Sequence, residues 1–203
     1  MDNQKECPII LASASRSRAA MLVASGLKIK IEPADINEAS VKDACLREGR
    51  NVDYVAALLA RKKAELISGR NREAFVIGAD QMLDCGGTWF DKPIDLASAA
   101  KTLKAIRGRC HDLVTSVSVV QYEKEIWHKT ERATLQVREF SDNFIEQYLQ
   151  NVGELALTSV GAYQLEGQGA QLFEKIEGDY FTILGLPLLP LLSFLRAQNL
   201  ILS

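Results

Sequence analysis

The order in which strand and helix patterns follow one another constrains the fold of this chain most. Short apolar or alternating segments at 9–12, 27–32 and 74–79 are typical of strands, and amphipathic segments between them are typical of helices. Strand-like segments at 113–120 and 133–137 come later in the chain. We therefore predict a three-layer α/β fold with a mixed sheet, formed by a chain of 203 residues that we treat as a single domain.

Local signals mark where the predicted elements begin and end. Ser13 or Ser15 can cap a helix that Gly26 ends, because their hydroxyls can accept from free backbone N–H groups. Segments 170–176 and 180–184 flank Glu177-Gly178-Asp179, which predicts a β-hairpin. The other predicted helix starts are Asp95, Ser141 and Pro187.

The overall composition argues against several classes of protein. Hydrophobic residues make up 47% and charged residues 25%, an ordinary globular mixture. The formal net charge of -2 argues against a general nucleic-acid or membrane-surface binder, which usually carries basic excess. The apolar stretch 183–195 is too short and too interrupted by proline to span a bilayer.

The cysteines indicate a reducing compartment rather than a zinc site. Cys7, Cys45, Cys85 and Cys110 form no C-x-x-C pair, and the chain has only two histidines. The N-terminus has no basic region followed by an apolar run, so we see no secretory signal. We expect reduced thiols and a cytoplasmic protein.

One lysine lies on the apolar side of the clearest predicted helix, at 52–67. Lys63 follows Leu59 by four residues and precedes Leu66 by three, so all three share one stripe. Its ammonium group therefore points toward a core or a cleft. Snorkelling, with a buried stem and a solvated head, is the alternative from periodicity alone.

Two polar segments follow predicted strands. Residues 13–18, Ser-Ala-Ser-Arg-Ser-Arg, enter a helix N-terminus, where free N–H groups, hydroxyls and guanidinium groups favour phosphate. A plain serine cap with solvated arginines is the alternative. Asp80 follows the apolar run 74–79 and can bind a metal or act as a general base. The alternative for Asp80 is an Asx turn that leaves the strand.

Two further segments are weaker candidates. Pro93 stiffens the chain beside Lys92, which suits a fixed cation, although a surface turn is the simpler account. Three glycines within 161–169 mark a loop where backbone approaches another group closely. Glu166 in this loop could accept hydrogen bonds from a base edge. A simple glycine-rich connection is an equal alternative, and the segment lacks the ending of a P-loop.

Taken together and in order, these segments resemble the Maf family of nucleotide pyrophosphatases. The resemblance covers nearly the whole chain, and each piece is short while the ordered set is specific. The matching segments are Leu11-Ala12-Ser13-Ala14-Ser15, Leu59-Ala60-Arg61-Lys62-Lys63-Ala64, Gly78-Ala79-Asp80-Gln81, Lys92-Pro93, Gly108-Arg109-Cys110-His111, Gly161-Ala162-Tyr163, Glu177-Gly178-Asp179-Tyr180 and Gly185-Leu186-Pro187-Leu188.

The resemblance implies a fold, a reaction and a cofactor. It implies an elongated α/β fold like that of Maf and inosine triphosphatase proteins, with a cleft between two lobes. It implies cleavage of a nucleoside triphosphate between the α- and β-phosphates, with Mg²⁺ or Mn²⁺, to a monophosphate and pyrophosphate. By position it implies catalytic residues Asp80 (proton acceptor), Lys63, Lys92 and Arg18; substrate-binding residues Ser13, Ser15, Ser17, Gln81 and Glu166; and metal ligands Glu38 and Asp80.

Three positions depart from the commonest family pattern. Gln81 stands where threonine is frequent and Glu166 where glutamine is frequent, which resembles the branch acting on 7-methyl-GTP rather than on dTTP and UTP. Ser17 fits neither branch, since it lacks both the arginine and the tryptophan seen there. We expect 7-methyl-GTP and other nucleoside triphosphates as substrates, in the removal of non-standard nucleotides, with a dTTP/UTP pyrophosphatase as the alternative.

Other classes of function compete with this one. A non-catalytic nucleotide-binding protein that regulates septum formation is one, and a phosphatase that removes the terminal phosphate is another. A triphosphate carries about four negative charges, so its cleavage needs cations at both ends of the scissile bond. Arg18, Lys63 and Lys92 supply such cations. The expected partners are a nucleoside triphosphate and a second copy of the chain in a homodimer, with no nucleic acid and no membrane.

Overall fold

The computed structural model of the chain describes residues 8–202 and divides it into two compact units. Unit 1 contains the described residues up to Asp80, together with Thr115–Glu131 and the segment that begins at Gly185. Unit 2 contains Gln81–Val114 and Arg132–Leu184. A single domain and a cleft between two lobes stay predictions.

The strands belong to a seven-stranded sheet, in the order β2-β1-β3-β5-β6-β7, with β4 paired to β3. Strand β1 pairs in parallel with β2 and β3, whereas β4 pairs antiparallel with β3, and β7 antiparallel with β6. The predicted mixed sheet is therefore confirmed. The strands are β1 Ile9–Leu11, β2 Ile29–Ile31, β3 Phe75–Cys85, β4 Thr88–Phe90, β5 Cys110–Gln121, β6 Lys124–Val137 and β7 Phe173–Glu177.

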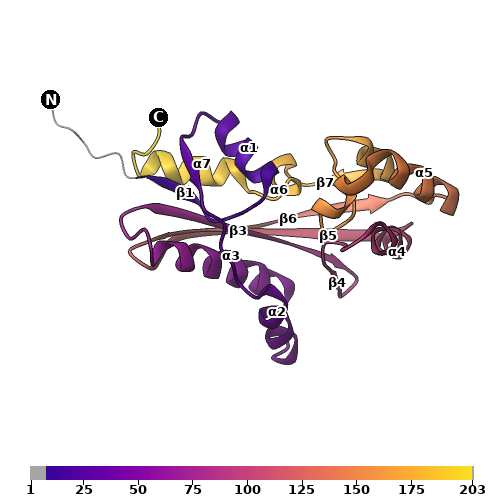
Figure 1. Cartoon of the computed structure of the whole chain (residues 1–203), viewed down its shortest axis with the longest axis horizontal. Coiled ribbons are helices and arrows are strands. Elements are labelled where there is room, and N and C mark those ends of the chain that lie inside the picture. Colours follow the sequence, from indigo (N-terminus) through magenta and orange to yellow (C-terminus); the bar gives the residue numbers. More distant parts are fainter. Residues whose placement is uncertain (1–7, 203) are drawn as a thin grey trace. The chain divides into compact units, whose positions relative to one another are not determined.

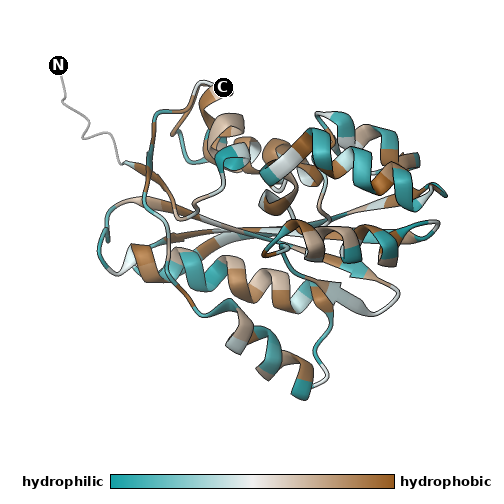
Figure 2. Cartoon of the chain, turned by 45° about the vertical axis from the view of Figure 1, so that its right-hand side comes forward, coloured by the Kyte–Doolittle hydropathy of each residue, from teal (hydrophilic) through white to brown (hydrophobic). Residues whose placement is uncertain are grey.

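Helices cover both faces of the strands of unit 1. In Figure 1, α3 lies on one face and α1 and α7 lie on the other, so unit 1 has the three layers that the sequence predicts. The helices carry both hydrophobic and hydrophilic residues, as Figure 2 shows. The helices of this unit are α1 Arg16–Ala24, α2 Glu38–Arg47, α3 Val52–Ser68 and α7 Leu188–Ala197.

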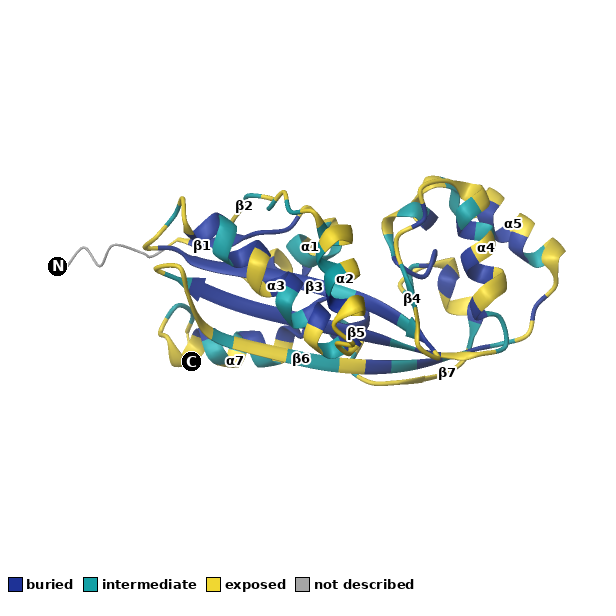
Figure 3. Ribbon diagram, turned by 90° about the horizontal axis from the view of Figure 1, so that it is seen from below, coloured by how far each residue is buried: buried dark blue, intermediate teal, exposed yellow. Residues whose placement is uncertain are grey.

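Helix α3 packs very closely on β3 because Gly78 has no side chain. A Cβ built at Gly78 would lie 2.1 Å from the carbonyl oxygen of Ala60 and 2.9 Å from the Cβ of Ala64. The alanines complete the close contact, since larger residues there would separate helix and strand. Strand β3 is buried along most of its length, as Figure 3 shows.

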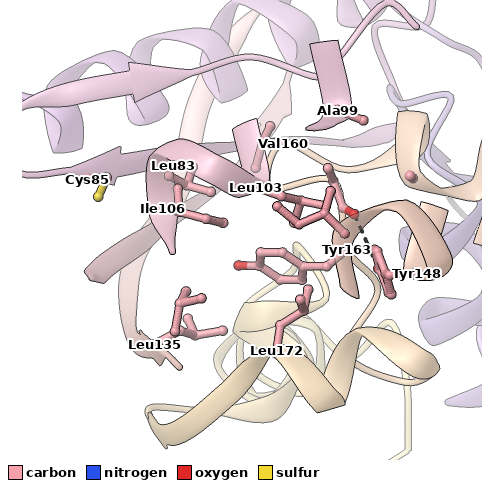
Figure 4. Close-up of a cluster of buried hydrophobic side chains, with 14 of the residues drawn as sticks. Leu83, Cys85, Ala99, Leu103, Ile106, Leu135, Tyr148, Val160, Tyr163 and Leu172 are labelled. Carbon is pink, nitrogen blue, oxygen red and sulfur yellow. Dashed lines mark hydrogen bonds between the residues drawn. The ribbon is translucent and has the colours of Figure 1, made fainter. Parts of the chain in front are cut away.

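Unit 2 has its own hydrophobic core. Figure 4 shows Tyr163 among Leu103, Leu135 and Leu172, and the hydroxyl of Tyr148 donates to the carbonyl oxygen of Ala162. The α-helices of this unit are α4 Leu96–Ile106, α5 Asp142–Val152 and α6 Tyr180–Ile183, and its 3-10 helices are η1 Gly153–Thr158 and η2 Gln168–Leu172.

The predicted helix caps are present. The side chain of Ser15 accepts from the N–H of Arg18 at the start of α1, and Ser141 caps α5 in the same way. Asp95 and Ser98 form a reciprocal capping box at α4. Gly26 has a φ of 83° directly after the last turn of α1. Pro187 immediately precedes α7, so the predicted start of the last helix is also confirmed.

Strand β3 is longer than predicted. We expected it to end at Asp80, but it continues to Cys85, so Asp80 lies within a strand and not in an Asx turn. The reason is a second pairing: Leu83 faces Phe90 and Asp84 faces Trp89 across the antiparallel β3–β4 ladder. This pairing satisfies backbone groups that a turn would otherwise leave to water. Strand β6 also begins earlier than the predicted 133–137, at Lys124.

The predicted hairpin around residues 177–179 is wrong, because residues 170–172 of its first segment belong to η2 and its second segment is not a strand. Residues 173–177 form β7, but Tyr180–Ile183 is the short helix α6. Asp179 decides this, because its carboxylate accepts from the N–H of Thr182 and caps a helix instead of turning into a strand. Helix α2 is an element that the sequence patterns did not indicate.

Cys45, Cys85 and Cys110 are free thiols, as expected, and Cys7 lies outside the described residues. Within residues 8–202, no helix combines the length and the apolar character that crossing a membrane requires.

Candidate functional site

Arg18 is held by uncharged acceptors in unit 1. Its Nε donates to the carbonyl oxygen of Gly185 at 2.7 Å. Its Nη1 donates to the carbonyl oxygen of Ala79 at 2.9 Å and to Ser13 Oγ at 3.1 Å. No ion pair of Arg18 is present within residues 8–202. The positive charge of Arg18 therefore has no bound carboxylate and is available to an anion.

The parallel pairing of β1 with β3 places these groups together. Leu11 faces Ile77, and the N–H of Ala12 donates to the carbonyl oxygen of Ile77, so Ser13 follows β1 beside Ala79. The hydroxyl of Ser13 also accepts from the N–H of Ser15, which stabilises the turn into α1. The parallel pairing of β1 with β3 thus places the segment that begins at Ser13 beside Ala79, the residue before Asp80.

Ser15 and Ser17 complete the start of this helix. Ser15 is the N-cap of α1, and its side chain accepts from the N–H of Arg18 at 3.4 Å. Ser17 is half-buried within the first turn of α1. Ser15 is therefore a helix cap, as the alternative for residues 13–18 expected. Arg18 is bonded to the protein and is not a solvated arginine, which that alternative also expected.

Lys63 joins two carboxylates in unit 1. Its Nζ lies 2.6 Å from Glu38 Oε1 and 2.7 Å from Asp80 Oδ1. Lys63 is only 8% exposed, and its ammonium group contacts carboxylates, which excludes the snorkelling alternative. Glu38 is the first residue of α2, after the N-cap Asn37, and its side chain is 43% exposed.

The environment shifts the pKa values of these groups in different directions. Burial raises the pKa of the Asp80 carboxyl, and the charges of Lys63 and Arg18 offset this only in part. Partial burial also disfavours ionised Glu38, but the hydrogen bond and charge of Lys63, together with the charges of Lys42 and Arg18, outweigh it and lower the pKa of that carboxyl. Burial lowers the pKa of the Arg18 guanidinium, with Asp80 and Glu38 acting in the opposite direction. Asp80 is thus a stronger base than an ordinary aspartate.

The remaining predicted residues belong to unit 2. The Nε2 of Gln81 donates to the carbonyl oxygens of Thr182 and Ile183 at 3.0 and 3.1 Å, at the end of α6. Lys92 is exposed after β4, and Glu166 is exposed in a turn before η2. The structure thus brings Ser13, Arg18, Glu38, Lys63 and Asp80 together in unit 1, while Gln81, Lys92 and Glu166 belong to unit 2.

The glycines of segment 161–169 serve contacts within the segment itself. A Cβ at Gly161 would lie 2.1 Å from the ring of Tyr163, and a Cβ at Gly169 would lie 2.4 Å from the carbonyl oxygen of Gln164. The sequence indicated that backbone in this loop approaches another group closely, and that group belongs to the same segment. This packing gives the turn with Glu166 a defined backbone.

Residues 8–198 match the family described as Maf-like protein. The chain belongs to this family. A nucleoside triphosphate pyrophosphatase of Paramagnetospirillum magneticum is 50% identical over 190 residues, covering 94% of this chain and 98% of the relative. A 7-methyl-GTP pyrophosphatase of Rhizobium etli is 47% identical over 188 residues, covering 93% of this chain and 94% of the relative. The predicted family is confirmed.

A solved structure of a nucleoside-triphosphatase / dITP/XTP pyrophosphatase from Mycobacterium abscessus is a more distant neighbour. Its sequence identity is 16% and its TM-score is 0.38, with 66% of this chain and 75% of that chain covered. That similarity is too low to support a statement about function.

The acidic groups of this Maf-like protein fit a divalent cation that receives its other ligands from elsewhere. Asp80 Oδ2 is buried and has no hydrogen-bond partner in the described structure, while Oδ1 contacts Lys63. A buried acceptor without a donor suits a cation. No group of three or more His, Cys, Asp or Glu side chains in residues 8–202 could hold a metal ion. Glu38 and Asp80 are the two carboxylates that meet at Lys63, and one or two carboxylates with substrate phosphates are a usual set of ligands for a divalent cation such as Mg²⁺.

Sequence reasoning missed the main-chain groups that hold Arg18 in this Maf-like protein. The carbonyl oxygens of Ala79 and Gly185 are two of its acceptors. No side-chain pattern can indicate them, because every residue has a carbonyl group. The Gly185-Leu186-Pro187 segment before the last helix was the only available signal, since glycine before a proline marks a turn.

Proposed function

We propose that this Maf-like protein hydrolyses a nucleoside triphosphate to a monophosphate and pyrophosphate. The observation that carries the proposal is that unit 1 contains two groups of opposite net charge. Arg18 is a cation without a bound carboxylate, whereas Lys63, Glu38 and Asp80 together carry one net negative charge when ionised. The first suits a phosphate and the second a divalent cation. Relatives named as nucleoside triphosphate pyrophosphatases support the reaction.

The proposed roles follow from the chemistry of each group. Asp80 accepts a proton from the attacking water, and its raised pKa makes it a better base for this step. Arg18 binds phosphate oxygens, and Ser13 and Ser15 hold the chain around it. Lys63 keeps Glu38 and Asp80 together. Pyrophosphate leaves with the electron pair of the broken bond between the α- and β-phosphates.

We further propose that Mg²⁺ or Mn²⁺ is the cofactor and that Glu38 and Asp80 hold it. A bound cation would neutralise negative charge that develops on the phosphates. Lys92 is proposed as an additional cation for the substrate, on the strength of the family resemblance.

For the nucleotide, we propose 7-methyl-GTP, with dTTP and UTP as the alternative. A 7-methylated guanine carries a positive charge on its imidazole ring, which a carboxylate favours. Glu166 is the exposed carboxylate of the segment 161–169. Gln81 and Ser17 are the other proposed substrate-binding residues. Relatives named 7-methyl-GTP pyrophosphatases from Rhizobium etli and Rhizobium meliloti support this proposal.

A hydrolysis screen tests the reaction. The purified chain is incubated with canonical and methylated triphosphates, with Mn²⁺ or Mg²⁺ and with a chelator, and both pyrophosphate and orthophosphate are measured. Pyrophosphate and a monophosphate in equal amounts support the proposal. Orthophosphate with a diphosphate indicates a phosphatase, and binding without turnover indicates a regulatory nucleotide-binding protein. Turnover that the chelator does not change would contradict the metal requirement.

We also propose a cytoplasmic location, which the free thiols of Cys45, Cys85 and Cys110 support. The homodimer and the lack of a nucleic-acid partner stay predictions.

A further inference from the structure

The carbonyl oxygen of Gly185 accepts a hydrogen bond from Arg18, and the proposed reaction gives this bond no role. Gly185 lies between α6 and α7 and has a φ of 100°. Its carbonyl oxygen accepts from Arg18 Nε at 2.7 Å, the shortest of the three hydrogen bonds of this guanidinium. A residue with an L side chain rarely adopts this φ, so the local backbone depends on glycine.

The geometry of the guanidinium shows what this bond does. Ser13 Oγ and the carbonyl oxygen of Ala79 both accept from the same nitrogen, Nη1. Two acceptors on one nitrogen hold that corner of the planar group. A bond at a second nitrogen is what fixes the plane against rotation, and the bond of Nε to Gly185 supplies it.

Fixing the plane also fixes the direction of the donors that the protein does not use. Nε and Nη1 are used by the protein, whereas none of the hydrogen bonds within residues 8–202 uses Nη2. The donors of Nη2 are therefore left without an acceptor in the described part of the protein and are held in a fixed direction, in which a phosphate could accept from them. Preorganised donors of this kind reduce the cost of orienting the reacting groups.

We infer that Gly185 is a positioning residue, whose carbonyl oxygen orients Arg18 for the triphosphate. This inference rests on the proposed function, because it takes Arg18 to bind phosphate. The alternative is that Gly185 only permits the turn before α7. In that case its replacement would lower stability without a specific effect on turnover.

The test compares two glycines with similar backbones in unit 1. Gly185→Ala places a Cβ 3.4 Å from Arg18 Nε and 3.6 Å from Arg18 Nη2, both ordinary contacts, so its main effect is on the backbone and its carbonyl. Gly26→Ala is the matched control, because Gly26 has a φ of 83° and nothing lies within 4 Å of a Cβ there. Both variants should lose stability to strain. Only Gly185→Ala should also lose kcat/KM, by roughly 10- to 100-fold, since misplacement of about 1 Å can have an effect of that size.

A double-mutant cycle then tells positioning from a general defect. Arg18→Ala should remove most of the activity, and adding Gly185→Ala to it should cause little further loss, because both act through one group. Additive losses would overturn the inference, as would full activity of Gly185→Ala or an equal loss in Gly26→Ala.

Arg18→Lys keeps the test decisive if Gly185→Ala does not fold. Lysine retains the positive charge but has no planar fork to bond Gly185 and Ala79 together, so we expect a loss comparable to that of Arg18→Ala. Normal turnover of Arg18→Lys would overturn the positioning role. Normal turnover of Arg18→Ala would instead contradict the proposed function of Arg18 itself.

Discussion

At the scale of single residues, Asp80 combines a bound and an unbound oxygen in a buried carboxylate. Oδ1 contacts Lys63, and Oδ2 has no partner in the described structure. Asparagine at this position keeps an oxygen for Lys63 and removes both the base and the charge. Asp80→Asn should therefore fold and lose about 10²- to 10⁴-fold in kcat, measured as pyrophosphate release.

The matched control is Asp84→Asn on the same strand. The side chain of Asp84 accepts from the N–H of Gly87 in the β3–β4 turn and has no proposed role in the reaction. This variant should keep nearly normal turnover. More than about a tenth of the wild-type rate in Asp80→Asn would exclude Asp80 as the general base, because a positioned base contributes at least about 10²-fold.

Glu166 is the residue at which we predict how the nucleobase of the substrate is recognised. Wild type should hydrolyse 7-methyl-GTP better than dTTP, and Glu166→Gln should narrow or reverse the ratio of the two kcat/KM values by roughly 10- to 100-fold. The reason is that a neutral amide does not favour a cationic base. Glu174→Gln, another exposed glutamate of unit 2, should leave the ratio unchanged. If Glu166→Gln leaves the ratio of the two kcat/KM values unchanged, Glu166 is not the residue that recognises the nucleobase.

At the scale of elements, the contact of α3 with β3 supports the site. Lys63 comes from the helix and Asp80 from the strand, and Gly78 lets the two approach. The atom nearest to an added Cβ is the backbone oxygen of Ala60, which cannot move without moving the helix. Gly78→Ala should therefore lower the free energy of unfolding by about 1–3 kcal/mol or more, measured by denaturant titration.

Gly69→Ala provides the control at the end of the same helix. The nearest atom to its Cβ would be the carbonyl oxygen of Leu66 at 3.6 Å, an ordinary contact, so stability should change little. Gly78→Ala should also lower turnover, because a displaced helix carries Lys63 away from Asp80. Equal stability of the two variants would contradict the close packing.

At the scale of the whole molecule, a buried histidine links stability to pH. His111 is 2% exposed, and its Nε2 lies 2.6 Å from the hydroxyl of Tyr163. Burial lowers the pKa of His111 from 6.5 to about 4, against a smaller opposite effect of Asp112. The folded protein therefore holds the neutral imidazole, while the unfolded chain takes up a proton below pH of about 6.5.

The sign of the effect follows from this difference. Above pH of about 6.5 both states are neutral at His111, and stability does not depend on it. As the pH falls from 6.5 towards about 4, the unfolded state is stabilised, and the free energy of unfolding should drop by on the order of 3 kcal/mol. His111→Gln, which can still bond Tyr163, should lack this part of the drop in urea titrations at several pH values. Identical pH profiles would contradict the assignment.

The sequence by itself determined the family and several of the elements. Apolar periodicity, helix caps and glycine stops are local properties of a few neighbouring residues, so α1, α3, α4, α5 and α7 could be predicted. The ordered motifs indicated the family and named the side chains of the candidate site. They also marked Lys63 as a lysine on an apolar stripe, but they left open whether water or a carboxylate would receive it.

Only the tertiary structure decided how those residues are held. Arg18 and Gly185 are 167 positions apart, and the contact of Lys63 with Asp80 depends on the approach of α3 to β3 at Gly78. The length of β3 was likewise decided by its pairing with β4. The physical reason is common to all of them. Hydrogen bonds to main-chain carbonyls and pairing between strands depend on three-dimensional position, which side-chain patterns along the chain do not encode.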